Sequence, residues 1–127
     1  MLASFQMKLI SKTRKRLRSV DKHSFYEGKT LAQVEWWLSY CSEYPDLAWA
    51  RLRVFSDGSA DAAFDASKVY SFDERRFASF FLSEDEYLPF DSMDEQDEAD
   101  IGAKKADISP PSWIDDARAT FEYLGTY

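Results

Sequence analysis

Alternating hydrophobic and polar residues over 47–65 predict the element around which the chain is organised. The first half of this stretch has an aliphatic residue at every second position: Ala48, Ala50, Leu52 and Val54. This period of two is typical of a strand with one buried face. A turn tetrad follows at 56–59, and a second alternating run begins at Ala60. The pattern therefore predicts a β-hairpin.

The length of the turn decides the register of this hairpin. A two-residue loop would pair Val54 with Asp61 and place a charge on the apolar face. A three-residue loop pairs Val54 with Ala60 and puts Gly58 at the left-handed position of a bulged turn. The pairs that follow in this register are Leu52–Ala62, Ala50–Phe64 and Arg53–Asp61. We therefore predict the three-residue loop, and we expect the opposite side of the hairpin, with Arg51, to face solvent.

A helix is predicted over 30–43, before the hairpin. Thr30 and Gln33 have the spacing of a capping box, and apolar residues recur behind them at intervals of three and four. The apolar members are Leu31, Val34, Leu38 and Cys41, with Trp37 beside them. Pro45 prevents continuation of the helix. We expect this helix to pack on the Leu52 side of the hairpin.

Two more helices are predicted after the hairpin. Residues 71–74 have the pattern of a second capping box, and they precede a helix expected over 73–82. The apolar face of that helix would contain Phe77, Phe80 and Phe81. A last helix is expected over 112–124 and would end at Gly125.

Together these elements predict an α+β fold in a single domain, residues 1–127. We expect a small antiparallel sheet centred on the 47–65 hairpin, with three to four helices packed mainly on one face. The length is enough for one core and too short for two ordinary domains. A content of 45% hydrophobic and 31% charged residues is typical of a globular chain.

Charge is distributed unevenly along the chain. The formal net charge is −7, yet residues 1–23 carry seven basic residues and one acidic residue, a net +6. Residues 1–29 therefore form a candidate basic arm, whose pattern fits a short strand or a helix over 11–21. Residues 84–111 form an acidic segment that we expect to be partly loop, because acids at this density repel one another.

The acidic segment is the candidate surface for binding a basic protein. From Glu84 to Asp100 it contains nine acids and no basic residue. Aromatic residues among these acids could anchor a partner, because aromatic side chains often provide most of the binding energy of an interface. The candidate partner-binding residues are Glu84, Asp85, Glu86, Tyr87, Asp91, Asp94, Glu95, Asp97 and Glu98.

The basic arm suggests a second function, which is binding of nucleic acid. Its candidate phosphate contacts are Lys12, Arg14, Lys15, Arg16 and Arg18. Aromatic residues that could stack on bases are absent from the arm until Phe25 and Tyr26. The arm could equally be a solvated face, or it could pair with the acidic segment of the same chain.

The sequence contains no recognisable catalytic, cofactor-binding or metal-binding motif. A single histidine, His23, excludes a multi-histidine metal site, and a single cysteine, Cys41, excludes an internal disulfide. The acidic run lacks the spacing of a calcium-binding EF-hand loop. We therefore expect no catalytic, cofactor-binding or metal-ligating residues, and an enzyme with carboxylates in a cleft is the third hypothesis.

The cysteine content and the hydropathy pattern favour a cytoplasmic protein. One cysteine fits a reducing compartment, and no stretch approaches the ~20 apolar residues of a membrane-spanning helix. The apolar run at 2–10 precedes the basic cluster, which is the reverse of the order in a signal peptide.

The leading hypothesis is a non-enzymatic cytosolic protein-binding module. It would use its acidic, aromatic-containing surface to bind another protein of basic character, as a monomer or a homodimer, without membrane association. A small inhibitor of the immunity type, which neutralises a basic toxin, is one form of this function. Complementary charge would chiefly speed the encounter, and aromatic anchors would supply affinity.

Overall fold

The computed structural model describes residues 22–64, 68–113 and 122–127, and every structural statement below concerns these residues. The strands are β1 (Leu31–Ser39), β2 (Trp49–Phe55), β3 (Ala60–Phe64), β4 (Lys68–Phe72), β5 (Tyr87–Pro89) and β6 (Glu122–Thr126). The α-helices are α2 (Lys22–Tyr26), α3 (Arg75–Glu84) and α4 (Glu95–Ile101), and the 3-10 helices are η1 (Phe90–Ser92) and η2 (Lys105–Asp107).

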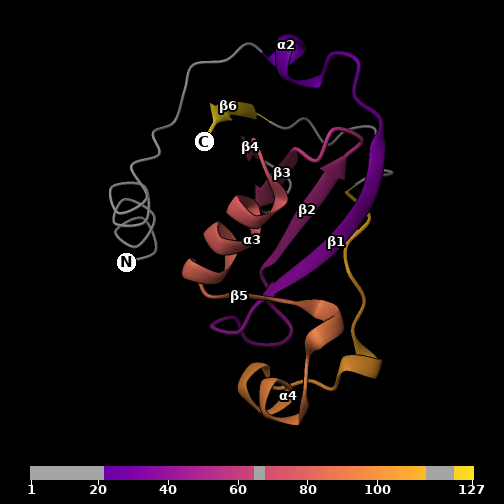
Figure 1. The fold of residues 1–127 in the computed structure, drawn as a ribbon. Coiled ribbons are helices and arrows are strands. Elements are labelled where there is room, and N and C mark those ends of the chain that lie inside the picture. The colour runs from indigo at the N-terminus through magenta and orange to yellow at the C-terminus, as the bar shows by residue number, and fades with distance from the viewer. Residues whose placement is uncertain (1–21, 65–67, 114–121) are drawn as a thin grey trace.

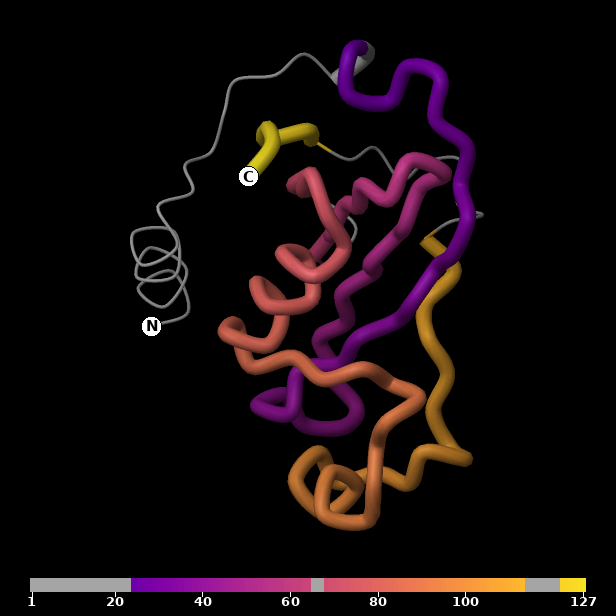
Figure 2. The backbone as a smooth tube through the Cα atoms, in the orientation of Figure 1, coloured from indigo at the N-terminus to yellow at the C-terminus, as the bar shows by residue number. Residues whose placement is uncertain are grey.

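The six strands form one mixed sheet in the order β5-β1-β2-β3-β4-β6 (Figure 1). Neighbouring strands are antiparallel except β4 and β6, which are parallel. The helix α3 crosses one face of the sheet (Figures 1 and 2), and α2 contacts residues of the opposite face. The expected small antiparallel sheet with helices mainly on one face is therefore wrong.

The hairpin prediction is confirmed in its register. Strands β2 and β3 pair Val54 with Ala60, and the register continues with Arg53–Asp61, Leu52–Ala62 and Ala50–Phe64. Gly58 has a φ of 88°, in the left-handed region. The N–H of Phe55 donates to the carbonyl of Ser59 at 2.8 Å, and the N–H of Gly58 donates to the carbonyl of Phe55 at 2.9 Å. These bonds define a type I turn followed by a bulge at glycine.

The expectation that the other side of the hairpin faces solvent is wrong. Arg51 is only 3% exposed and Asp61 is 0% exposed. The helix α2 covers this face, and the hydroxyl of Tyr26 donates to Asp61 Oδ2 at 2.7 Å. Arg53 donates to both carboxylate oxygens of Asp61 from the neighbouring strand. Asp61, a polar residue of the alternating pattern, is therefore buried on a face where it has charged and hydrogen-bonding partners.

The main core lies between the sheet and α3. Ala50, Ala60 and Ala62 have no exposed surface at the centre of the sheet, and Phe81 and Leu82 of α3 pack in the same core. The small methyl groups leave room for large rings from neighbouring elements. Four of these rings belong to Phe64, Tyr70, Phe72 and Tyr127. The aromatic content of the chain is therefore largely structural.

The helix expected over 30–43 is wrong, because β1 occupies Leu31–Ser39. Val34, Trp36 and Leu38 recur at every second position, as in a strand, while the intervals of three and four residues from Leu31 to Cys41 also fit a helix, so the sequence pattern is ambiguous. Pairing with β2 over the length of the strand decides the outcome. The backbone N–H of Thr30 donates to Ser56 Oγ at 3.1 Å, in a contact with the hairpin turn and not a helix cap.

The helix expected over 73–82 is present as α3, but its predicted capping box is absent. Glu74 is the N-cap residue and its side chain makes no cap bond. Ser71 lies in β4, where it is completely buried. Strand pairing places its hydroxyl among other hydroxyls, so it is not available to cap a helix.

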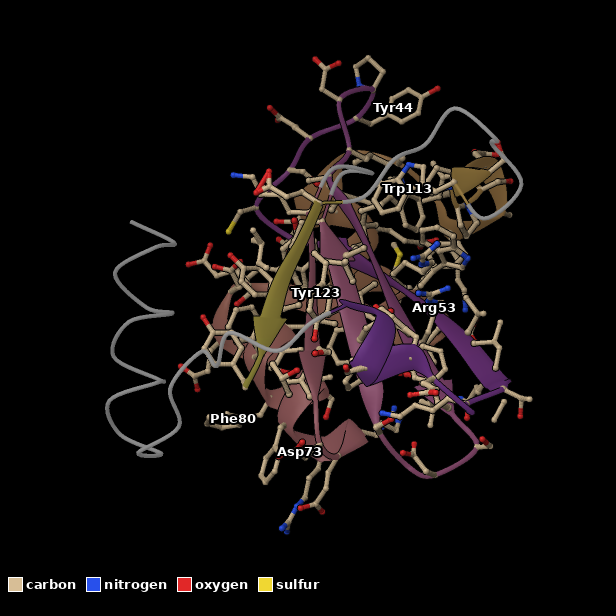
Figure 3. All side chains as sticks on the ribbon, turned by 90° about the horizontal axis from the view of Figure 1, so that it is seen from above. Tyr44, Arg53, Asp73, Phe80, Trp113 and Tyr123 are labelled. Atoms are coloured by element: carbon tan, nitrogen blue, oxygen red, sulfur yellow. The ribbon has the colours of Figure 1, made fainter. Side chains whose placement is uncertain are left out.

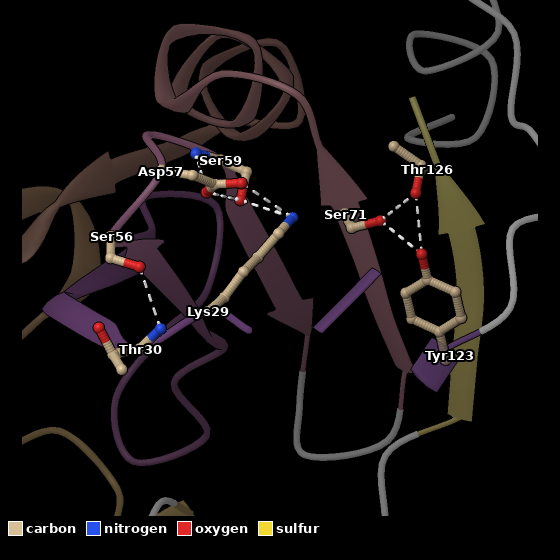
Figure 4. Close-up of polar contacts among 8 residues, drawn as sticks. All are labelled: Lys29, Thr30, Ser56, Asp57, Ser59, Ser71, Tyr123 and Thr126. Carbon is tan, nitrogen blue, oxygen red and sulfur yellow. Dashed lines mark hydrogen bonds and ion pairs between the residues drawn. The ribbon is translucent and has the colours of Figure 1, made fainter. Parts of the chain in front are cut away.

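The last helix, expected over 112–124, is wrong at its C-terminal end, because Glu122–Thr126 is strand β6. Residues 114–121 lie outside the described part of the chain, as does the helix expected over 11–21. Three hydroxyls fasten β6 to β4 (Figure 4): Ser71 contacts Tyr123 at 2.7 Å and also Thr126, and Tyr123 contacts Thr126 at 2.8 Å. Each hydroxyl can donate to the next in this ring, so all three are satisfied without water.

We expect Gly58→Val to lower the free energy of unfolding by about 1 kcal/mol or more. No heavy atom lies within 4 Å of a Cβ built at this position. The cost would therefore come from the left-handed backbone alone, which a β-branched residue adopts poorly. Chemical denaturation measures the change. Gly58→Asn is the control, because asparagine tolerates this conformation, and equal destabilisation by both variants would contradict the assignment.

We expect Ser71→Ala to cost roughly 1–3 kcal/mol of stability, because it leaves buried hydroxyls of Tyr123 and Thr126 short of a partner. The matched control is Ser83→Ala, on the exposed surface of α3, where a change within about 0.5 kcal/mol is expected. Thermal or urea unfolding compares the two. Equal stability of both variants would show that the hydroxyl ring does not hold β6.

Candidate protein interface

Two segments meet at one end of the sheet, at the bottom of Figure 1, and we call them the acidic end: residues 40–46 and 84–101. The N–H of Tyr40 donates to the carbonyl of Glu86 at 3.2 Å, and the N–H of Tyr44 donates to the carbonyl of Ile101 at 2.8 Å. The loop between β1 and β2 is thus joined by backbone bonds to both ends of the 84–101 segment.

A second, smaller core positions α4 at this end. Leu38, Trp49 and Ile101 are buried together, and rings of Trp36 and Phe90 pack around Trp49 at centroid distances of 6.4 and 5.2 Å. Ile101 is the last residue of α4. The helix therefore rests on an apolar base and leaves its acidic residues on the outside.

The acidic segment contains its own helix start. Asp94 Oδ1 accepts the N–H of Asp97 at 3.0 Å, and Asp97 Oδ2 accepts the N–H of Asp94 at 3.0 Å. This reciprocal capping satisfies two backbone donors and places acids near the positive end of the helix dipole. Backbone hydrogen bonds, first from Asp97, lower the pKa of the Asp94 carboxyl. Part of the segment is helix and not loop for this reason.

Two of the predicted partner-binding residues are turned into the body. Asp85 is 3% exposed, and Tyr87 is half-buried, with its ring 5.5 Å from that of Phe64 in the main core. Asp85 is therefore not placed for direct contact with a partner, whereas Tyr87 keeps part of its surface exposed. Glu84, Glu86, Asp97 and Glu98 are partly exposed, and Asp91, Asp94 and Glu95 are exposed.

The loop adds residues to this surface that the sequence analysis missed. Tyr44 is 54% exposed and Tyr40 is 40% exposed, which is unusual for large side chains in this protein. Figure 3 shows Tyr44 at the tip of its loop, away from the sheet. Glu43 and Asp46 flank it and are also exposed. Reading 31–39 as a strand would have identified 40–46 as a strand-to-strand loop with two tyrosines.

The carboxylate of Glu86 contributes to raised pKa values for Tyr40 and Cys41. Partial burial, and then the charge of Glu86, raise the pKa of Tyr40. The thiol of Cys41 donates to Glu86 Oε2, and this hydrogen bond is the main cause of a raised pKa for Cys41. The exposed thiol is therefore protonated at neutral pH and is a poor nucleophile.

One basic side chain of the acidic segment is engaged internally. The N–H of Lys105 donates to Glu98 Oε2 at 2.7 Å, its Nζ donates to the carbonyl of Asp91 at 3.0 Å, and the Nζ lies 5.6 Å from the ring centroid of Phe90. Lys105 thus folds the segment after α4 back onto η1. It offsets only one of the many negative charges at this end.

A serine, a lysine and an aspartate meet at the hairpin turn, and their hydrogen bonds indicate a structural role (Figure 4). Lys29 Nζ donates to Ser59 Oγ at 3.0 Å, and Ser59 Oγ donates to Asp57 Oδ1 at 2.6 Å. The two Ser59 donors are the main cause of a lowered pKa for Asp57, so this carboxylate is a weak base. The serine hydroxyl is therefore not activated as a nucleophile.

Within 22–64, 68–113 and 122–127, no group of three or more His, Cys, Asp or Glu side chains could hold a metal ion. None of the helices in this part of the chain has the length and apolar character to cross a bilayer. The basic-arm residues Lys12 to Arg18 lie outside it.

Comparison with known proteins gives no relative from which a function could be transferred. The chain matches no family model, no curated protein and no solved structure. A function for this protein must therefore be inferred from the geometry of the acidic end.

We expect Glu86→Gln to lower the pKa of Cys41 toward its ordinary value, because the carboxylate that accepts the hydrogen bond of the thiol is lost. The rate of alkylation by iodoacetamide, measured against pH, should then rise at a lower pH than in the natural protein. Glu84→Gln is the matched control, since Glu84 does not contribute to the pKa of Cys41. Identical pH profiles for Glu86→Gln and the natural protein would contradict the hydrogen bond.

Proposed function

We propose that this protein binds a basic protein partner through its acidic end. The observation that carries the proposal is the exposure of Tyr40 and Tyr44 among acidic side chains on one surface. Exposed tyrosines provide contact area with little loss of conformational entropy, and they are enriched at the centres of interfaces. Carboxylates around them would select a basic partner and speed its approach.

The acidic end has the organisation that a docking surface requires. The loop and the segment around α4 are joined by backbone bonds at Tyr40 and Tyr44, and α4 is fixed to the body through Ile101. A surface held in this way loses little entropy when it binds. A small inhibitor of the immunity type, which neutralises a basic toxin, is a form of this function that the charge favours.

The proposal includes a cytoplasmic location. Cys41 is a free, exposed thiol, and such thiols persist in reducing compartments.

A charge-neutralised variant should lose the partner. The variant carries Glu43→Gln, Asp46→Asn, Asp91→Asn and Glu95→Gln, which are exposed positions outside the α4 capping pair. A matched control with the same change of charge carries Glu27→Gln, Asp73→Asn, Glu74→Gln and Glu122→Gln. Both variants and the natural protein are used to capture partners from native lysate, and captured proteins are then purified and tested by surface plasmon resonance.

The expected result is a basic protein that binds the natural chain and the control but associates at least ten-fold more slowly with the neutralised variant, with a weaker dependence on salt. Tyr44→Ala should instead speed dissociation, because it removes a contact and no charge. Equal binding by all the chains would contradict the proposal. Capture of nucleic acid that is lost on deletion of residues 1–21 would favour the basic arm as the binding element.

A further inference from the structure

The first and last described segments of the chain meet on the face of the sheet opposite α3. The ring of Tyr123, in β6, lies 6.2 Å from that of Phe25 and 5.9 Å from that of Tyr26, both in α2. The two α2 rings also contact Phe55 of β2, at 6.1 and 5.6 Å. Helix α2 therefore packs at the same time on the centre of the sheet and on its last strand.

The contacts of α2 resemble those of a lid with a hinge and a latch. The latch is the Tyr26 hydroxyl, which donates to Asp61 Oδ2 at 2.7 Å. The hinge is Gly28, with a φ of 72° and no heavy atom within 4 Å of its Cβ position. After the hinge the chain is held on the hairpin turn, because the N–H of Ser56 donates to the carbonyl of Thr30 at 2.8 Å and Ser56 Oγ accepts the N–H of Thr30.

Opening of this lid would not leave a buried charge without a partner. Asp61 is paired by two hydrogen bonds with Arg53, which is on the neighbouring strand of the same hairpin. The ion pair therefore stays intact when Tyr26 leaves, and water can replace the phenol hydroxyl. Breaking a buried pair would cost much more than this. The lid is thus a less costly element to open than any strand of the hairpin.

Helix α2 covers the side chain of Tyr123, which helps to hold strand β6 on the sheet. Tyr123 contacts Ser71 and Thr126 through its hydroxyl, and its ring lies under α2. Within the described residues, β6 pairs with β4 alone. When α2 lifts, Tyr123 loses its apolar cover, and one of the two tyrosines that hold β6 becomes solvated; the other is Tyr127, in the main core.

We propose that α2 is a hinged lid and that α2 and β6 open together as one cooperative unit. The open state exposes the ring of Phe55 and the outer edge of β4 and withdraws Tyr127 from the rings of Phe72 and Phe81, while the strand pairing of the hairpin, the helix α3 and the acidic end persist. Coupling of this kind is reciprocal: loosening β6 also loosens α2.

Amide hydrogen exchange, followed by NMR on the full chain, tests the proposal with Tyr26→Phe. The variant removes the latch hydroxyl and keeps the ring. The reporters are the N–H of Lys29, which donates to the carbonyl of Tyr26, and the N–H of Tyr127, which donates to the carbonyl of Ser71. Both should exchange roughly ten-fold faster or more, by a common factor, since a hydrogen bond to a charged group is lost. The amide of Gly102, bonded to Glu98, should not change.

Two further variants make the result decisive. Tyr44→Phe, at an exposed position, is the control and should alter none of these rates. Tyr123→Phe should speed exchange at Lys29 as well as at Tyr127, as reciprocity requires. Faster exchange at Lys29 with Tyr127 unchanged would show that the two segments open independently and would overturn the proposal. An equal rise at all amides, Gly102 included, or no rise at all would also overturn it.

Discussion

Asp61 is a carboxylate with no exposed surface, and the register of the β2–β3 hairpin is what makes its burial tolerable. In the observed register Asp61 lies opposite Arg53, which neutralises its charge with two hydrogen bonds. A shift by one residue would turn Asp61 toward α3, into a core without a cation. It would also turn Ala60 and Ala62 away from that core. Electrostatics and packing therefore require the same register.

The remaining architecture follows from this register on both faces. On one face the alanines leave space for α3 and for a group of aromatic rings that includes Tyr127. On the other face the Arg53–Asp61 pair gives Tyr26 an acceptor, so that a helix of five residues can be held on the sheet. Strand β1 pairs with the edge of β2 that lies opposite β3, and the loop that joins β1 and β2 places Tyr40 and Tyr44 at the acidic end.

The sequence predicted those features that depend on neighbours in the chain. The turn at Gly58 and the pairing of Arg53 with Asp61 are set within a few residues, so both were deduced correctly. Strand β1 lies where the sequence predicts a helix, because its apolar spacing fits both periods and its pairing with β2 is not a local signal. The parallel pairing of β6 with β4 joins residues about fifty positions apart, beyond the reach of any local pattern. Composition identified the acidic surface, whereas its exposed tyrosines depend on the strand assignment.

Hα–Hα contacts across the hairpin, measured by nuclear Overhauser effects, test the register most directly. The N–H of Phe55 donates to the carbonyl of Ser59, so these two residues form a hydrogen-bonded pair. Pairs that are not hydrogen-bonded have close Hα atoms, and they occur at every second position from Val54 toward the start of β2. The account predicts strong Hα–Hα effects for Val54–Ala60, Leu52–Ala62 and Ala50–Phe64. Strong Hα–Hα effects joining Phe55 to Ala60 and Arg53 to Ala62 would instead show the two-residue turn, which places Val54 opposite Asp61, and they would contradict the burial of Asp61 beside Arg53.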